Sequence, residues 1–218
     1  MCLGVADVQL GEPGWTFEYL VASDLNSGLD SLRPAKVTSV HEFGEAGSDA
    51  GRDFVDSINR QLQGSRRGLA VIQIPDYCAT FDQTLVLMSR FACSLGSSSA
   101  VAIFSWPRGT AFWNYLVDCP RARAFVPDIA QLMELVALRS NARRIYLIVF
   151  SCGSPLLAEA LIMLRKQHSD DDPVALQRRY RIANALFVAA DLDLTTFTRS
   201  QLSIRREIAT RSPLSLRD

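Results

Sequence analysis

The sequence lacks net charge and any long apolar run. Its 218 residues contain 23 basic and 23 acidic side chains, so the formal net charge is zero. A balanced charge argues against nucleic acid as a partner and against attraction to an anionic membrane surface. The longest apolar runs have seven or eight residues. A membrane-spanning helix needs about 20, so we expect no membrane span.

Paired cysteine motifs are also absent. The five cysteines are odd in number, and no two stand in a C-x-x-C arrangement, which argues against a zinc site or a redox motif. We therefore expect no metal, no cofactor and reduced cysteines. The first residues, MCLGVADVQLGEPGW, lack the basic start and long apolar core of a signal peptide. These features together predict a cytoplasmic protein. The cysteines are Cys2, Cys78, Cys93, Cys119 and Cys152.

What the sequence does contain is typical of one globular α/β domain. Hydrophobic residues make up 48% of the chain, and a chain of this length buries about 70% of its extended surface. Residues 1–50 alternate partly between apolar and polar side chains and contain glycine-rich turns, which predicts a β-rich extension. We expect this extension to pack on a main domain that covers residues 51–218.

Within the main domain, amphipathic segments alternate with short apolar ones. Apolar segments predict strands over 69–74, 100–106, 144–150 and 181–190, and the first of them is continuously apolar, as in a strand buried on both faces. Apolar spacing predicts helices over 53–62, 80–95, 121–139, 154–167 and 195–208. This alternation predicts a doubly wound, mostly parallel sheet with helices on both faces. Thr80 is a candidate N-cap, and Pro127 falls in the first turn of its helix.

A serine stands where the third of these strands meets its helix. Ser151 begins a tight turn between them, which is the arrangement of a nucleophile elbow, unless it is an ordinary serine at a strand end. The backbone N–H of Cys152 is a candidate oxyanion donor, and a second donor is expected near Asp76 and Tyr77, after the first buried strand. Asp191 follows the last strand, where it either orients a catalytic histidine or caps the next helix.

Four side chains have two interpretations each. Trp106 and Trp113 either line an acyl pocket or pack in the core. Cys152 is better explained as a small residue that starts a helix than as a nucleophile, because no histidine is near it in the sequence. Asp193 is a better candidate for a helix N-cap than for a catalytic group.

The missing component is a general base. A serine nucleophile needs a histidine to take its proton, and in α/β hydrolases that histidine follows the acid in the chain. The only histidines are His41 and His168, and neither follows Asp191. We expect both to be solvated or capping side chains, with His168 at the far end of the helix behind the turn.

From about residue 3 to residue 208 the chain resembles a family of α/β-hydrolase-fold proteins of unassigned function, usually described as esterase/lipase-superfamily enzymes. Four blocks in order carry the resemblance. They are IQIPDYCATF (72–81), FSWP (104–107), VFSCG (149–153) and AADLD (189–193). The resemblance implies the hydrolase fold, the Ser151 elbow, the acid at Asp191 and a small ester as substrate.

The departures from the family pattern fall mostly in the catalytic apparatus. Pro75 and Asp76 replace the histidine and glycine of the oxyanion loop, and proline has no N–H to donate. Val149 replaces a small residue and is expected to crowd the turn. Phe150 replaces a histidine, and the C-terminal segment in which the family places its catalytic histidine has no counterpart here.

Three hypotheses therefore remain open. The chain is a serine ester hydrolase whose base comes from a missing C-terminal segment or a partner chain. Alternatively, it is a catalytically inactive hydrolase-fold protein that acts as a binding or interaction module. A third, weaker hypothesis is the truncated product of a damaged gene.

Overall fold

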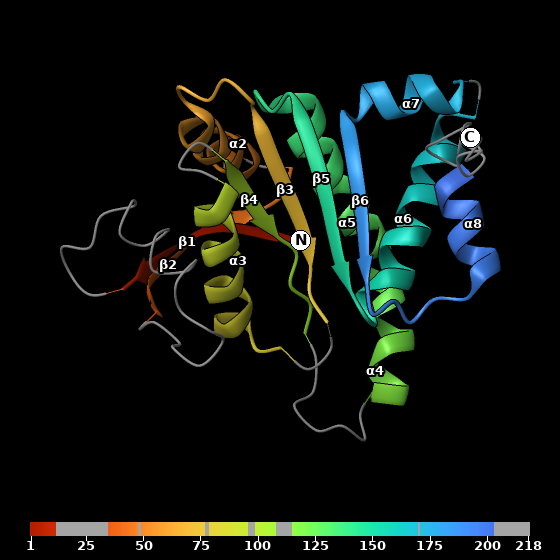
Figure 1. The fold of residues 1–218 in the computed structure, drawn as a ribbon, viewed down its shortest axis with the longest axis horizontal. Helices are drawn as coiled ribbons and strands as arrows, with labels where there is room; N and C mark the ends of the chain where they lie inside the picture. Colours follow the sequence, from red (N-terminus) through yellow and green to blue (C-terminus); the bar gives the residue numbers. More distant parts are fainter. Residues whose placement is uncertain are drawn as a thin grey trace, which may run out of the picture.

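The computed structural model contains a four-stranded parallel sheet in the order β4-β3-β5-β6 (Figure 1). The strands are β3 (Leu69–Ile74), β4 (Ala100–Ile103), β5 (Arg144–Phe150) and β6 (Ile182–Val188). Each predicted apolar segment forms one of them, so the predicted doubly wound parallel sheet is confirmed. The structure describes residues 1–11, 35–47, 49–76, 79–95, 99–107, 115–169 and 171–202.

The N-terminal extension forms a separate antiparallel pair. Strand β1 (Cys2–Leu10) pairs with β2 (Ala35–Glu45), which confirms that this part of the chain is β-rich. The pair packs against the first two helices of the main domain, α2 and α3. Leu3 is buried and belongs to the main hydrophobic core. The boundary between the extension and the domain near residue 50 stays a prediction.

Helices cover both faces of the parallel sheet (Figure 1). The helices are α2 (Asp49–Leu62), α3 (Phe81–Leu95), α4 (Tyr115–Arg121), α5 (Val126–Glu134), α6 (Gly153–Gln167), α7 (Pro173–Arg179) and α8 (Leu194–Leu202). A 3-10 turn, η2 (Ala122–Phe125), precedes α5, and a π-helical turn, η3 (Leu135–Arg139), follows it. Reciprocal hydrogen bonds between Thr80 and Gln83 cap α3, which confirms Thr80 as its N-cap.

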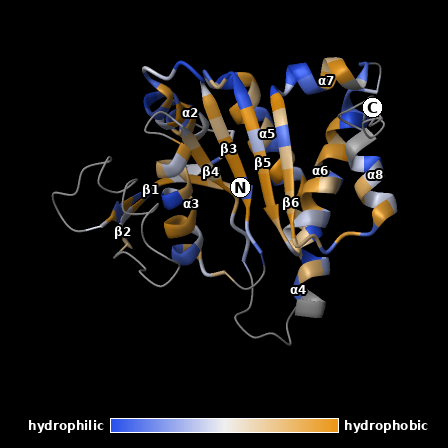
Figure 2. Ribbon diagram, viewed as in Figure 1, coloured by the Kyte–Doolittle hydropathy of each residue, from blue (hydrophilic) through white to orange (hydrophobic). Residues whose placement is uncertain are grey.

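The core has two layers because successive side chains of a strand point to opposite faces. In β3, where every residue is buried, Ala70, Ile72 and Ile74 belong to the larger core, with α2, α5 and α6. Leu69 and Val71 belong to a smaller core against α3. Figure 2 shows β3 and β5 apolar along most of their length. Strand β3 is therefore buried on both faces, as its continuous apolar sequence predicts, whereas β6 is partly exposed and its Leu186 faces solvent.

Two helical predictions need correction. The single helix predicted over 121–139 is a series of short segments, α4, η2, α5 and η3, and the first of them begins at residue 115. Pro120 and Pro127 explain the interruptions before α5, since proline lacks the N–H that a continuous helix requires. Helix α7 was not predicted, because its seven residues follow a polar loop and give a weak periodic signal.

Candidate active site

Ser151 occupies a strained turn between β5 and α6. Its φ angle is 43°, in the left-handed region, which costs a residue with a Cβ roughly 1–2 kcal/mol. Three backbone hydrogen bonds hold the turn in this conformation. The Ser151 N–H donates to the Val188 carbonyl at 2.9 Å, and the Ser151 carbonyl accepts from Ser154 N at 2.9 Å and from Asp191 N at 3.3 Å. A sharp strand-to-helix turn with a strained serine is the geometry of a nucleophile elbow.

The elbow lies directly against the end of β3. A Cβ atom on Gly153 would lie 2.8 Å from the Pro75 carbonyl oxygen and 2.8 Å from Ile74 Cγ2. Only glycine fits at this distance. The lack of a side chain at Gly153 also makes room for Val149, which was expected to crowd the turn. Val149 is fully buried, and its Cγ2 would be 3.1 Å from a Cβ on Gly153. The loop after β3 and the Ser151 turn are therefore neighbours.

The oxyanion candidates lie on these two neighbouring segments. Cys152 is the N-cap of α6 and is 2% exposed, so its backbone lies at the positive end of a 15-residue helix. Asp76 follows Pro75, and its Oδ1 accepts a hydrogen bond from Ala79 N at 2.9 Å. The carboxylate therefore caps the loop after β3. Tyr77 lies outside the described residues.

The loop after β6 brings Asp191 to the elbow. The 3.3 Å hydrogen bond from Asp191 N to the Ser151 carbonyl makes the two backbones adjacent, and the Asp191 side chain is exposed. Asp193 caps α8, since its Oδ1 accepts from Thr196 N at 2.8 Å. This hydrogen bond lowers the pKa of the Asp193 carboxyl. The predicted N-cap role of Asp193 is confirmed.

The structure describes one of the two tryptophans that are candidates for lining an acyl pocket. Trp106 is 3% exposed and belongs to the main core, where its ring stacks on Phe104 with 6.4 Å between ring centroids. Its described surroundings are those of a packed core residue. Trp113 lies outside the described residues.

His168 lies at the opposite end of α6 from the elbow. It is the C-cap of this helix, and a helix of 15 residues is about 22 Å long. Its Nε2 is 3.1 Å from the hydroxyl of Tyr180, which donates to Glu134 Oε1 at 3.1 Å. Burial, reinforced by the charge of Glu134, raises the pKa of Tyr180 well above its usual range. His168 is thus the C-cap residue of α6 by its backbone, and its side chain, expected to be solvated or capping, instead contacts Tyr180.

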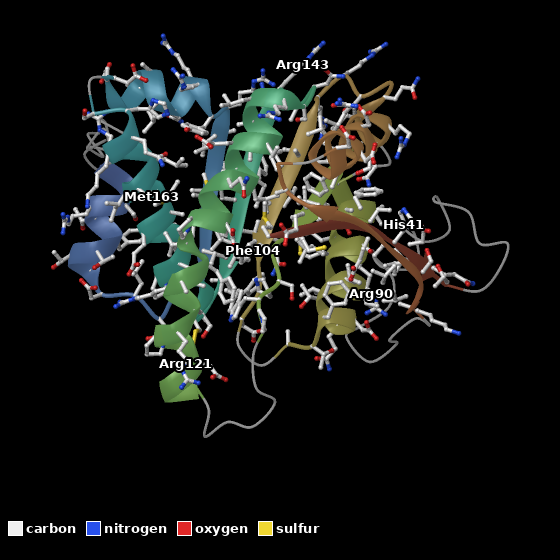
Figure 3. The ribbon with its side chains drawn as sticks, turned by 180° about the vertical axis from the view of Figure 1, so that it is seen from behind. His41, Arg90, Phe104, Arg121, Arg143 and Met163 are labelled. Atoms are coloured by element: carbon white, nitrogen blue, oxygen red, sulfur yellow. A yellow bond between two sulfur atoms is a disulfide. The ribbon has the colours of Figure 1, made fainter. Side chains whose placement is uncertain are left out.

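His41 lies on the N-terminal strand pair (Figure 3). It is exposed, pairs with Val5 of β1 and makes an edge-on ring contact with Phe43, with 5.4 Å between ring centroids. Strand β2 packs mainly against β1, α2 and α3, none of which forms the elbow. Neither histidine is therefore placed beside Ser151 by the elements that carry it.

Sequence reasoning missed Cys119 as a neighbour of the elbow. Cys119 in α4 forms a disulfide with Cys152, with 6.3 Å between their Cα atoms. The expectation of reduced cysteines is therefore wrong for this pair, whereas Cys2 is a free thiol. The partners are 33 positions apart in the sequence and match no local motif, and only the packing of α4 beside the elbow brings them together. Cys78 lies outside the described residues.

Two features are absent from the part of the chain that the structure describes. None of the helices there combines the length and the apolar character needed to cross a membrane. In the same part of the chain, no three His, Cys, Asp or Glu side chains gather into a group that could hold a metal ion.

The arrangement at this end of the sheet agrees with a comparison against known protein families. The family described as alpha/beta hydrolase of unknown function (DUF900) matches residues 52–214. The match includes all four strands of the parallel sheet, the Ser151 turn and the loop that contains Asp191. Comparisons with curated proteins and with solved structures gave no match.

Proposed function

Because the chain belongs to the family of alpha/beta hydrolases of unknown function, we propose that it is a serine ester hydrolase with Ser151 as its nucleophile. The observation that carries this proposal is the left-handed backbone of Ser151. Glycine would adopt the same conformation without strain. A costly conformation kept at a serine, at the carboxyl end of a parallel sheet, is typical of a residue with a chemical task.

The proposed chemistry is acyl transfer in two steps. Ser151 Oγ attacks the ester carbonyl carbon, and its proton passes through a general base to the departing alcohol. The Cys152 N–H and a donor from the loop at Asp76 and Tyr77 stabilise the oxyanion of the tetrahedral intermediate. Water then attacks the acyl-serine, which releases the carboxylic acid and restores the hydroxyl.

The chain supplies a nucleophile and an acid for this reaction, but its two histidines are engaged elsewhere. His168 contacts Tyr180 at the far end of α6, and His41 lies on β2. We therefore assign the base to a histidine that this sequence does not contain, from a further segment or from a partner chain. In that arrangement Asp191 orients the incoming imidazole.

A second candidate function is a hydrolase-fold binding module without catalysis. The placement of both histidines favours it, and so does the Asp76 carboxylate on the oxyanion loop. A negative charge on that loop opposes the negative charge that develops on the substrate oxygen. The small ester substrate and the cytoplasmic location predicted from the sequence belong to these proposals and are still to be tested.

Labelling with a fluorophosphonate probe, with and without added imidazole, separates the two functions. If the elbow is intact and only the base is missing, imidazole accelerates labelling of the wild-type chain. Ser151→Ala abolishes the labelling. Ser154→Ala is the matched control, because Ser154 lies on the first turn of α6, is fully buried, and its Oγ has no hydrogen-bond partner among the described residues. Folded protein that is not labelled at any imidazole concentration contradicts the hydrolase proposal and favours the binding module.

A further inference from the structure

We propose that Cys119 and Cys152 form a reversible dithiol–disulfide couple that controls the position of α4 beside the elbow. Cys152 directly follows Ser151, so the disulfide attaches α4 to the residue next to the proposed nucleophile. The thiol chemistry and the movement of α4 stand independently of catalysis. Only the consequence for Ser151 reactivity rests on the proposed function.

The disulfide holds α4 close to Ser151. The Cα atoms of Cys119 and Cys152 are 6.3 Å apart, and consecutive Cα atoms are about 3.8 Å apart. The Cα atoms of Cys119 and Ser151 are therefore within about 10 Å of each other. Figure 1 shows α4 projecting from the end of the sheet at which β5 and β6 terminate. A change in α4 would thus alter access to the elbow.

Helix α4 is short. It has seven residues, includes Pro120 and, among the described residues, packs chiefly against the adjoining turn η2. Isolated helices of this length are unstable in water. Breaking the disulfide therefore removes a covalent, long-range attachment of a helix that is not stable by itself.

The chain after Arg121, the last residue of α4 (Figure 3), is fixed independently of the disulfide. Arg123 forms an ion pair with Glu159 of α6 at 3.0 Å, and Ala122 and Val126 are buried in the main core. Reduction is therefore expected to release α4 and to leave η2 and α5 in place.

The elbow itself does not depend on the disulfide. The backbone hydrogen bonds of Ser151 with Val188, Ser154 and Asp191 remain when the sulfur–sulfur bond is broken. The close packing of Gly153 on Pro75 also remains. Reduction is thus expected to open the approach to Ser151 without changing the geometry of the turn.

The exposure of the two sulfurs defines the exchange reaction. Cys119 is half-buried and Cys152 is 2% exposed, so a thiolate from solution attacks the Cys119 sulfur. The sulfur–sulfur bond breaks, and its electron pair leaves on Cys152. The N-terminus of α6 favours this leaving group, because the helix dipole stabilises a thiolate there.

The exchange is balanced by an external thiol–disulfide pair. With a dithiol reductant, its second thiol resolves the mixed disulfide on Cys119. The protein gains two electrons and two protons, and the reductant becomes a disulfide. A low-molecular-weight disulfide of the glutathione class reverses the reaction. In a cytoplasmic protein, as the sequence predicts this one to be, disulfides are usually transient and redox-sensing.

The test uses the full chain in graded mixtures of reduced and oxidised dithiothreitol. Alkylation of free thiols followed by mass measurement reports the state of Cys119 and Cys152, and hydrogen exchange reports the stability of α4. We expect both thiols to appear together in the folded protein and to disappear on reoxidation. On reduction, exchange in α4 should accelerate about tenfold or more, whereas exchange in the first turn of α6 stays unchanged.

Two variants make the result specific. Cys119→Ala should show fast α4 exchange under all conditions, without a redox response, and Cys2→Ala should behave as the wild-type chain does. A disulfide that is reduced only after unfolding would overturn the proposal. Equal α4 exchange in both redox states would do the same.

Fluorophosphonate labelling in the presence of imidazole then separates this proposal from the proposed function. Faster labelling of Ser151 in the reduced chain, about threefold or more, supports both. If α4 responds and Ser151 is labelled in neither state, the redox couple stands and the hydrolase proposal fails. If Ser151 is labelled equally in both states while α4 responds, control of access is contradicted and the hydrolase proposal stands.

Discussion

The two ends of α6 have opposite characters. At its N-terminus, a strained serine, a disulfide and a glycine in close contact with β3 lie together at the elbow. At its C-terminus, His168, Tyr180 and Glu134 form a connected hydrogen-bonded group. A hydrolase needs its serine and its histidine at the same place. In this chain Ser151 and His168 lie at opposite ends of a helix about 22 Å long, so His168 is too far away to act on the proposed nucleophile.

At the N-terminal end of α6, the disulfide is expected to make the largest contribution to the free energy of unfolding. Because it joins residues 33 positions apart, it restricts the unfolded chain, and Cys119→Ala should lower the free energy of unfolding by about 3–4 kcal/mol. Chemical denaturation under oxidising conditions measures this loss. Cys2→Ala is the control, because Cys2 is an exposed free thiol. An equal loss in both variants would contradict a specific role for the disulfide.

The close packing of the elbow on β3 gives the next largest effect. Gly153→Ala places a Cβ 2.8 Å from a backbone oxygen that has little freedom to move, so we expect a loss of about 2–3 kcal/mol. Gly51→Ala is the matched control. Its Cβ would meet Leu135 at an ordinary 3.8 Å, and alanine favours the helix, so stability should stay the same or rise by up to about 1 kcal/mol. Thermal or denaturant unfolding of both variants decides the comparison.

Substitution at the C-terminal end of α6 should cost less stability than at the N-terminal end, and the stability that this end contributes should depend on pH. Tyr180→Phe removes a hydroxyl that bridges Glu134 and His168, at an expected cost of about 1–2 kcal/mol. The raised pKa of Tyr180 means that the unfolded chain loses this proton first as pH rises. Its contribution to stability is complete below about pH 10, where an unfolded tyrosine ionises, and falls above that value.

Unfolding measured between about pH 8 and pH 11 tests this dependence. The wild-type chain should lose more stability over this range than Tyr180→Phe. Parallel curves for the two proteins would show that Tyr180 makes no contribution to the alkaline response.

The smallest expected effect is a gain in the free energy of unfolding of about 1 kcal/mol, where the preceding substitutions cause a loss. Ser151→Gly relieves the left-handed strain and should stabilise the fold, whereas it removes the proposed nucleophile. Ser154→Gly, three residues later and within helical backbone, should destabilise by a similar amount, since glycine disfavours helix. A loss of stability in Ser151→Gly would show that the turn is not strained.

The sequence predicts the sheet well because the information is local. Continuous apolar segments such as LAVIQI are characteristic of strands buried on both faces, and the side chain of Thr80 signals the start of α3. Pro120 and Pro127 are also local signals, for interruptions of a helix, but the helical periodicity over 121–139 led to the prediction of one continuous helix. The position of the elbow was likewise predictable from the serine between β5 and α6, and the four-block resemblance placed the chain in its family.

The contacts around the elbow depend on residues far apart in the chain and were not predictable in the same way. Gly153 is required by the end of β3, and Val149 fits only because Gly153 has no side chain. Cys119 meets Cys152 because α4 folds back onto the turn, and no spacing rule indicates that contact. Long-range packing decides these features, so they became apparent only in three dimensions.

The hydrogen bonds of Ser151 also set an order of events during folding. Its N–H donates to the carbonyl of Val188 in β6, and its carbonyl accepts from the N–H of Asp191, which follows that strand. Both partners lie about 40 residues further along the chain. Two of the three hydrogen bonds that hold its strained conformation therefore require β6 to be docked on β5. We expect a nascent chain that has not yet completed β6 to lack both of them. The geometry proposed for catalysis is fully held only in a chain whose sheet is complete.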